Sequence, residues 1–282
     1  MKLRVSVCTR SESLGMKQFR LAAACALVIA ILALAPGSAQ TSAGVSALGI
    51  NVSPAKLELS MPAGASYNIP VTVQNGSTAP THIVASMVDF GLSRSGDYQF
   101  VKVGEKPYSL MRWATINPKE FDLGPGMIQQ VRVSLAIPKE ELSGEYHGIV
   151  FFATRPTRQQ HGVAFSVRIA STVYVTIPGT VKIGGAIAKM SAVGDKANET
   201  YRVLFKNTGN AHVYVGGTLE VRKDGQIVDR IAIPPNQLVE RGEDRLFQVS
   251  GKALLHGTYQ AIALLDYGGT TMTGGEIQFE KN

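Results

Sequence analysis

Apolar residues recur at every second position through most of this chain, and this pattern constrains its fold more than any other feature. From residue 50 onward, short alternating runs are bounded by Gly, Pro, Asn and Asp. Successive side chains on a strand point to opposite faces, so such runs predict half-buried β-strands. Only residues 138–142 are predicted to form a helical turn. The pattern therefore predicts an all-β protein.

A first group of strands is expected over residues 46–180. Turn residues separate the strands, as at Asn75-Gly76 and Gly124-Pro125-Gly126. The expected strands are 50–52, 57–59, 69–73, 83–90, 98–101, 111–116, 128–135, 148–152 and 163–177. This number and spacing of strands are typical of an immunoglobulin-like (Ig-like) β-sandwich.

A second group is expected over residues 181–282, after the interruption at Pro178-Gly179. Asp224-Gly225 predicts a tight hairpin between two of its strands. The expected strands are 182–187, 201–207, 217–223, 226–233, 245–249, 257–266 and 275–280. About 100 residues is the usual size of a sandwich, so the sequence predicts two Ig-like β-sandwich domains in tandem. The short link between them predicts a fairly fixed angle.

Residues 1–39 have the composition of a cleaved export signal. Five basic residues precede an apolar run over residues 21–35, which is shorter than the roughly 20 residues that a membrane span needs. Small residues at Gly37 and Ala39 predict cleavage after Ala39, and Met16 is an alternative translation start. We expect a periplasmic or secreted protein that touches the membrane only through this transient signal peptide.

The charge and cysteine content of the mature chain exclude several functions. The whole chain has a formal net charge of +7, but removal of residues 1–39 leaves 23 basic and 20 acidic residues. The basic excess that would suggest nucleic-acid binding is therefore mostly discarded. Both cysteines, Cys8 and Cys25, lie in the same discarded segment. The mature protein has no disulfide framework and no cysteine-based zinc site.

No constellation of residues predicts an enzyme. The histidines are scattered singly along the chain, at positions 82, 147, 161, 212 and 256. No Gly-x-Ser-x-Gly elbow is present, and the glycine-rich segments at residues 124–126 and 184–185 lie between strands and do not open helices. We expect no catalytic residue, metal site, cofactor or small-molecule substrate.

Two segments resemble the amino-terminal domain of periplasmic pilus chaperones of the PapD type. One is Val-Ser-Pro-Ala-Lys-Leu-Glu-Leu at residues 52–59, and the other runs from Trp113 through Phe121-x-Leu123-x-Pro125-Gly126 into a Gln/Val/Arg strand at residues 130–133. Residues 144–152 are similar to the strand that follows in that family. The resemblance implies a non-enzymatic exported chaperone that binds secreted or pilin-like subunits.

The physical counterpart of this resemblance is one long strand near the end of the first sandwich. Alternating apolar residues run from Val163 through Ile169 and continue to Ile177. If part of this strand is a sheet edge, it exposes backbone groups that add to a partner's sheet by β-augmentation. The alternative is a central strand whose apolar row packs into the domain's own core.

The resemblance also implies a pair of cations that holds the partner's terminal carboxylate. Lys56 lies near the first expected position, whereas the second, near residues 171–173, has no cation and Arg168 is the nearest. The predicted partner-binding residues are Lys56, Val163, Phe165, Val167, Arg168 and Ile169.

A second interpretation is a cell-envelope structural or adhesion protein that binds wall polymer or a surface partner. Pro54, Gly64, Val71-x-Val73-x-Asn75 and Pro125-Gly126 are also similar to the first domain of WxL-interacting surface proteins. Those proteins normally end in a membrane span and a basic tail, which this sequence lacks. The pilus chaperone is therefore the preferred prediction.

Overall fold

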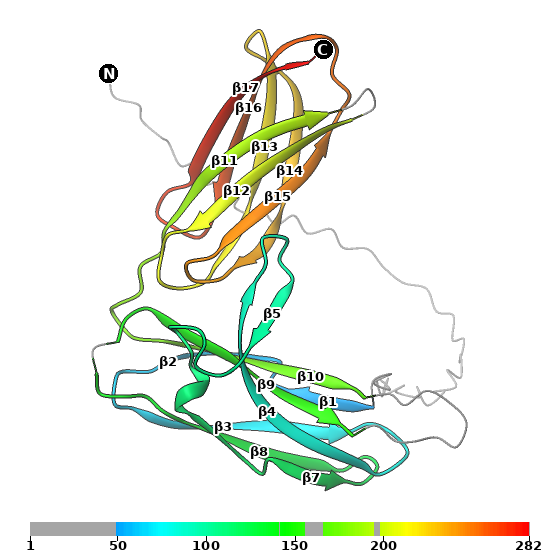
Figure 1. Cartoon of the computed structure of the whole chain (residues 1–282), viewed down its shortest axis with the longest axis vertical. Helices are drawn as coiled ribbons and strands as arrows, with labels where there is room; N and C mark the ends of the chain where they lie inside the picture. The colour runs from blue at the N-terminus through cyan, green and yellow to red at the C-terminus, as the bar shows by residue number, and fades with distance from the viewer. Residues whose placement is uncertain (1–48, 141, 156–165, 195–197, 282) are drawn as a thin grey trace, which may run out of the picture. The chain divides into compact units, whose positions relative to one another are not determined.

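The computed structural model of the chain describes residues 49–140, 142–155, 166–194 and 198–281, and these form almost entirely β-structure (Figure 1). The predicted signal peptide and its cleavage after Ala39 lie outside the described residues. No helix among the described residues is long and apolar enough to cross a membrane. All the described residues belong to one compact unit.

The first ten strands form two sheets. The strands are β1 (Ile50–Ser53), β2 (Lys56–Ser60), β3 (Ser66–Asn75), β4 (Thr81–Leu92), β5 (Tyr98–Val101), β6 (Ala114–Asn117), β7 (Glu120–Leu123), β8 (Ile128–Ala136), β9 (Glu145–Thr154) and β10 (Arg168–Thr176). One sheet has the order β1-β3-β8-β6 and the other the order β2-β10-β9-β4-β5, with β7 beside β4. This is the strand order of an Ig-like sandwich. In that fold, strands A, B, E and D form one sheet and strands C, F and G form the sheet that packs against it.

The remaining strands form a second pair of sheets. They are β11 (Gly185–Gly194), β12 (Glu199–Asn207), β13 (Val213–Lys223), β14 (Gln226–Val239), β15 (Asp244–Gly251), β16 (Gly257–Asp266) and β17 (Thr273–Lys281). Their orders are β11-β12-β15 and β14-β13-β16-β17. The predicted all-β fold of two Ig-like sandwiches is confirmed, while the boundary at residue 180 stays a prediction.

Alternation along each strand places the two cores. In β8 the inward side chains Val131, Val133 and Leu135 are almost fully buried, and the residues between them are more exposed. These valines pack with Val71 and Val175 in the first core, and a separate cluster that includes Phe205 fills the second sandwich. Each sandwich thus buries the apolar row that its sequence period supplies.

The predicted Asp-Gly hairpin is confirmed. Lys223 pairs with Gln226 across a loop of two residues. Asp224 and Gly225 in that loop have φ values of 50° and 79°. Two successive positive φ values match the right-handed twist of the flanking strands, and a glycine adopts such a value without steric cost.

Two local predictions are wrong. Residues 138–140 form no helical turn, and a short 3₁₀ helix (Met111–Trp113) stands where a strand was expected to start. Met111 is buried in the first core. A single helical turn can bury an apolar side chain as well as a strand can, so the apolar residue did not distinguish the two. Strand β7 was not predicted, because Glu120–Leu123 offers only two apolar residues for its alternation.

Candidate functional site

Strand β10 is paired unequally on its two sides. It pairs with β9 along its whole length, from Arg168 to Thr176. Strand β2 lies on the other side but pairs only with Thr172–Thr176. The predicted strand over residues 163–177 therefore has a double-sided portion and, before it, a portion with one described neighbour.

The direction of the backbone N–H and C=O groups shows which of them are available for pairing in the part of β10 before Thr172. The Thr172 N–H donates to the Ala55 carbonyl at 2.9 Å, on the β2 side, whereas the Ile177 N–H donates to Gly144 on the β9 side. N–H and C=O groups of alternate residues in a strand point to opposite sides, so those of Arg168 and Ala170 point away from β9. The described residues supply no hydrogen-bond partner for them. We call these four backbone groups the open flank.

The path of the chain between β1 and β2 explains why the open flank exists. Strand β1 belongs to the opposite sheet, where it pairs with β3. The chain crosses to β10 at Ser53-Pro54, and Pro54 has no N–H to donate. The Ser171 hydroxyl bonds the Pro54 carbonyl at 2.7 Å, which fixes the crossing beside β10. Pairing with β2 can therefore begin only beyond this point.

The apolar row of β10 faces the core of its own sandwich. Val173 and Val175 are fully buried, and Val167 and Ile169 are partly buried against the same cluster. The row therefore faces inward at these four residues, and Val167 and Ile169 keep part of their surface exposed. Val163 and Phe165, the other two apolar residues predicted to bind a partner, lie outside the described residues.

Arg168 lies on the outer face of the same sheet. Its guanidinium is centred 3.6 Å from the ring centroid of Phe151, and Phe100 meets that ring edge-on at 5.1 Å. A surface hollow of about 530 Å³ lies beside it, with Met87 and Val103 in its wall. Arg168 remains exposed to solvent although its guanidinium stacks on Phe151. This face therefore combines an apolar surface with the charged side chains of Arg168, Lys102 and Glu105.

Lys56 is already paired within the protein. Its ammonium group forms an ion pair with Glu58 and donates to the Tyr214 hydroxyl. Burial lowers the pKa of Lys56, but the hydrogen bonds with Glu58 and Tyr214 outweigh this and raise it. Tyr214 comes from β13, 158 residues away, and no sequence pattern indicated this contact.

The predicted two-cation anchor is not assembled by the described residues. Lys56 is opposite Thr172, and Arg168 lies four residues before Thr172 on β10, a separation of roughly 13 Å along a strand. Ser171 and Val173 are buried. Lys56 and Arg168 are therefore too far apart to hold the same carboxylate.

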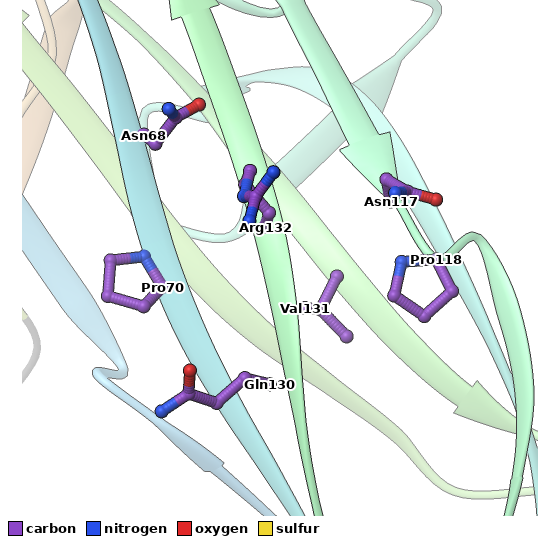
Figure 2. Close-up of a pocket in the computed structure, with 7 residues that line it drawn as sticks. All are labelled: Asn68, Pro70, Asn117, Pro118, Gln130, Val131 and Arg132. Carbon is purple, nitrogen blue, oxygen red and sulfur yellow. The ribbon is translucent and has the colours of Figure 1, made fainter.

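A second hollow lies on the outer face of the other sheet (Figure 2). It has a volume of about 390 Å³ and is lined by Asn68, Pro70, Asn117, Pro118, Gln130, Val131 and Arg132. Asn68 there accepts a hydrogen bond from Ser134. The hollow offers amides and one guanidinium for hydrogen bonding and has no aromatic ring in its lining.

Several solved structures are similar to this chain at low sequence identity. No family model matches the chain, and no curated protein matches it. Among solved structures, the class 5 fimbriae chaperone CfaA is similar at 13% identity, with 83% of this chain and 99% of that chain covered and a TM-score of 0.46.

Two other solved structures are similar over most of their length. The E. coli chaperone DraB has 16% identity, with 83% of this chain and 98% of that chain covered and a TM-score of 0.41. The complex of CsuC and CsuE from Acinetobacter baumannii, described as a chaperone and tip adhesion subunit pre-assembly complex, matches at 10% identity. It covers 81% of this chain and 97% of its own, with a TM-score of 0.45.

Proposed function

We propose that this protein is an exported, non-enzymatic chaperone that captures β-rich, pilin-like subunits of the cell envelope. The partner's edge strand adds to the open flank of β10 and so extends the sheet. The single observation that supports this most strongly is that the outward backbone groups of Arg168 and Ala170 have no hydrogen-bond partner among the described residues, although β10 is already paired with β9 on its other side. Such an edge is a template for another strand.

The neighbouring side chains suit an extended partner. Val167 and Ile169 are only partly buried, whereas Val173 and Val175 further along are fully buried. The apolar row thus becomes more exposed toward the start of β10, where Val163 and Phe165 continue it in the sequence. A partner strand would cover these side chains while it bonds to the backbone. Arg168 would add positive charge near the start of the open flank.

The predicted export signal supports the same function. A basic segment followed by the apolar run at residues 21–35 would carry the chain to the periplasm or the medium. A β-rich subunit exported by the same route would meet it there with its own edge unpaired. We place the protein in the extracytoplasmic compartment on this basis.

Proline substitution at Ala170 tests the proposal. Ala170→Pro removes only an N–H that faces the open flank, so the pairing of β10 with β9 is kept. Ala170→Ser keeps the N–H and is the matched control. Tagged wild-type protein and both variants are purified from the periplasm of the native host, and bound proteins are identified by mass spectrometry. We expect a β-rich exported protein to accompany the wild type and Ala170→Ser, and to be lost from Ala170→Pro.

Hydrogen exchange then locates the contact. In the complex, peptides that contain residues 166–171 are expected to be protected, and other edges of the protein unchanged. Phe165→Asp is expected to abolish capture and to leave the protein folded. Equal capture by Ala170→Pro, or unfolding of Phe165→Asp, would contradict the proposal.

Wall-polymer binding is the second candidate, and the hollow in Figure 2 is the place for it. Its amides and Arg132 could bond hydroxyl groups of a polysaccharide. The lining has no aromatic ring to stack on a sugar, so β-augmentation is the better supported proposal. Sedimentation of the purified protein with peptidoglycan, lost on Arg132→Ala, would favour the second candidate instead.

A further inference from the structure

Three titratable side chains that the proposed function does not use form a buried cluster. Glu145 and His147 are two residues apart on β9 and share a face, and Glu240 follows the end of β14. One oxygen of each carboxylate and a ring nitrogen of His147 all lie within 4.8 Å of one another. The three residues are 2%, 1% and 0% exposed, respectively.

The hydrogen bonds of His147 and Glu240 leave two acceptor atoms facing each other. His147 Nε2 is 3.3 Å from the Phe90 carbonyl oxygen, so Nε2 carries the proton and donates it. The other nitrogen, Nδ1, therefore presents a lone pair. It lies 3.6 Å from Glu240 Oε2, and neither atom has a hydrogen-bond partner. Two buried acceptors at this distance stay unsatisfied unless a proton or a cation lies between them.

The surrounding residues hold these side chains in place. The Tyr174 hydroxyl donates to Glu240 Oε1 at 2.7 Å. His212 Nδ1 is 2.8 Å from both oxygens of Glu145, and this contact outweighs burial and raises the pKa of His212. No Lys or Arg among the described residues forms an ion pair with the carboxylate of Glu240. Among the described residues, only the Tyr174 hydroxyl donates a hydrogen bond to this carboxylate.

We propose that Glu145, His147 and Glu240 bind a divalent transition-metal ion of the Zn²⁺ class. Zn²⁺ binds histidine nitrogen and carboxylate oxygen at about 2.0–2.2 Å, so two such ligands in a tetrahedral site are about 3.4 Å apart. The 3.6 Å between Nδ1 and Oε2 fits this geometry. A nitrogen ligand favours a transition metal over Ca²⁺ or Mg²⁺, which prefer oxygen.

The contacts around the cluster match those that orient ligands in metal sites. A metal-bound histidine commonly donates its second N–H to a backbone carbonyl, as His147 does to Phe90. Ligating carboxylates are commonly hydrogen-bonded in turn, as Glu240 is by Tyr174 and Glu145 by His212.

A metal at this place would join the two sandwiches, because Glu145 and His147 come from β9 and Glu240 follows β14. The inference is independent of the proposed function. Its sequence signal, Glu145-x-His147 on one face of a strand, is weak without Glu240, which lies 93 positions beyond His147 in the sequence.

Zinc titration of the full exported protein tests this proposal. The protein is treated with EDTA, dialysed and incubated long enough for ions to reach a buried site, and Zn²⁺ binding is measured by calorimetry. We expect one ion per chain and a rise in the melting temperature. Substitution by Co²⁺ should give the intense visible absorption of a four-coordinate site.

Two variants separate this site from adventitious binding. Glu240→Gln keeps the acceptor for Tyr174 and supplies an N–H to His147, so it should fold and bind Zn²⁺ at least 100-fold more weakly. His82→Gln removes a surface histidine that contacts Glu120 and Asp122, and it should bind Zn²⁺ as the wild type does. Absence of stoichiometric binding to the wild type, or binding that survives Glu240→Gln, would overturn the proposal. A proton shared by Glu240 and His147 would then account for their contact.

Discussion

The amide of Thr172 donates to the carbonyl oxygen of Ala55 at 2.9 Å, and this hydrogen bond marks where β10 gains its second neighbour. Before it, the strand is paired on the β9 side alone among the described residues. The consequence is a strand with a buried apolar row and an open backbone flank. Strand β10 is thus a central strand from Thr172 onward and, among the described residues, an edge strand before it.

Amide exchange in the free protein should alternate along the start of β10. The N–H groups of Ile169 and Ser171 face β9, whereas those of Arg168 and Ala170 face the open flank. We expect the amides of Ile169 and Ser171 to exchange more slowly than those of Arg168 and Ala170 by roughly two orders of magnitude. The hydrogen bonds to β9 must open before Ile169 and Ser171 can exchange. Exchange measured residue by residue by NMR checks this. Equal protection of all four amides would mean that another segment covers the flank.

Replacement of Lys56 should have little effect on folding. Its partners Glu58 and Tyr214 form an exposed group, and such pairs contribute about 0–1 kcal/mol. We expect Lys56→Met to change the free energy of unfolding by no more than this, and Tyr214→Phe to be similar. Urea denaturation of both variants and of the double variant measures their coupling. A loss above about 2 kcal/mol would show that the contact holds the structure together. Weaker client capture at unchanged stability would assign Lys56 to binding.

Two glycines of the second sandwich should differ sharply in their tolerance of a methyl group. A Cβ on Gly217 in β13 would lie 2.2 Å from the Leu264 carbonyl oxygen, whereas the nearest atom to a Cβ on Gly274 is 3.8 Å away. Gly217→Ala should therefore destabilise by at least about 2 kcal/mol, because backbone must move. Gly274→Ala, the matched control, should stay within about 0.5 kcal/mol of the wild type. Thermal unfolding of both variants decides the point, and equal melting temperatures would refute it.

His82 should titrate above the usual histidine range. Its ring nitrogens contact Glu120 at 2.7 Å and Asp122 at 2.8 Å, and these hydrogen bonds raise its pKa above 6.5. Its contribution to stability is then present below pH 6.5 and lost as the pH rises through the folded-state pKa. NMR titration of the wild type and of Glu120→Gln is the measurement. The variant's pKa should fall toward 6.5. A wild-type pKa at or below 6.5 would contradict the contact.

Much of the fold was predictable because its signals are local. The alternation of Val131, Val133 and Leu135 predicted both a strand and its buried face, and Asp224-Gly225 predicted its hairpin from two residues. The error at Met111 has a local cause as well. An apolar residue before a strand looks like part of the strand, and only packing selected a helical turn there.

The candidate site was less predictable. The period-two pattern predicted the row of Val167 and Ile169 without deciding whether it faced the core or a partner. No pattern indicated that Lys56 would meet Tyr214 or that His147 would meet Glu240. These contacts join residues from different sandwiches, and the sequence spacing of their members carries no information about distance in space.

The sequence by itself determined the strand class, the turns and the buried face of each strand, because these depend on neighbours within a few positions. Tertiary structure alone decided which flank of β10 is paired. The paired flank is set by the point at which β2 begins to run beside β10. A hydrogen bond from the Ser171 hydroxyl to the Pro54 carbonyl, 117 positions away in the sequence, fixes that point. Every residue except proline carries the same backbone N–H and C=O groups, whatever its side chain. The amino-acid sequence of β10 therefore does not indicate whether a neighbouring strand pairs with it.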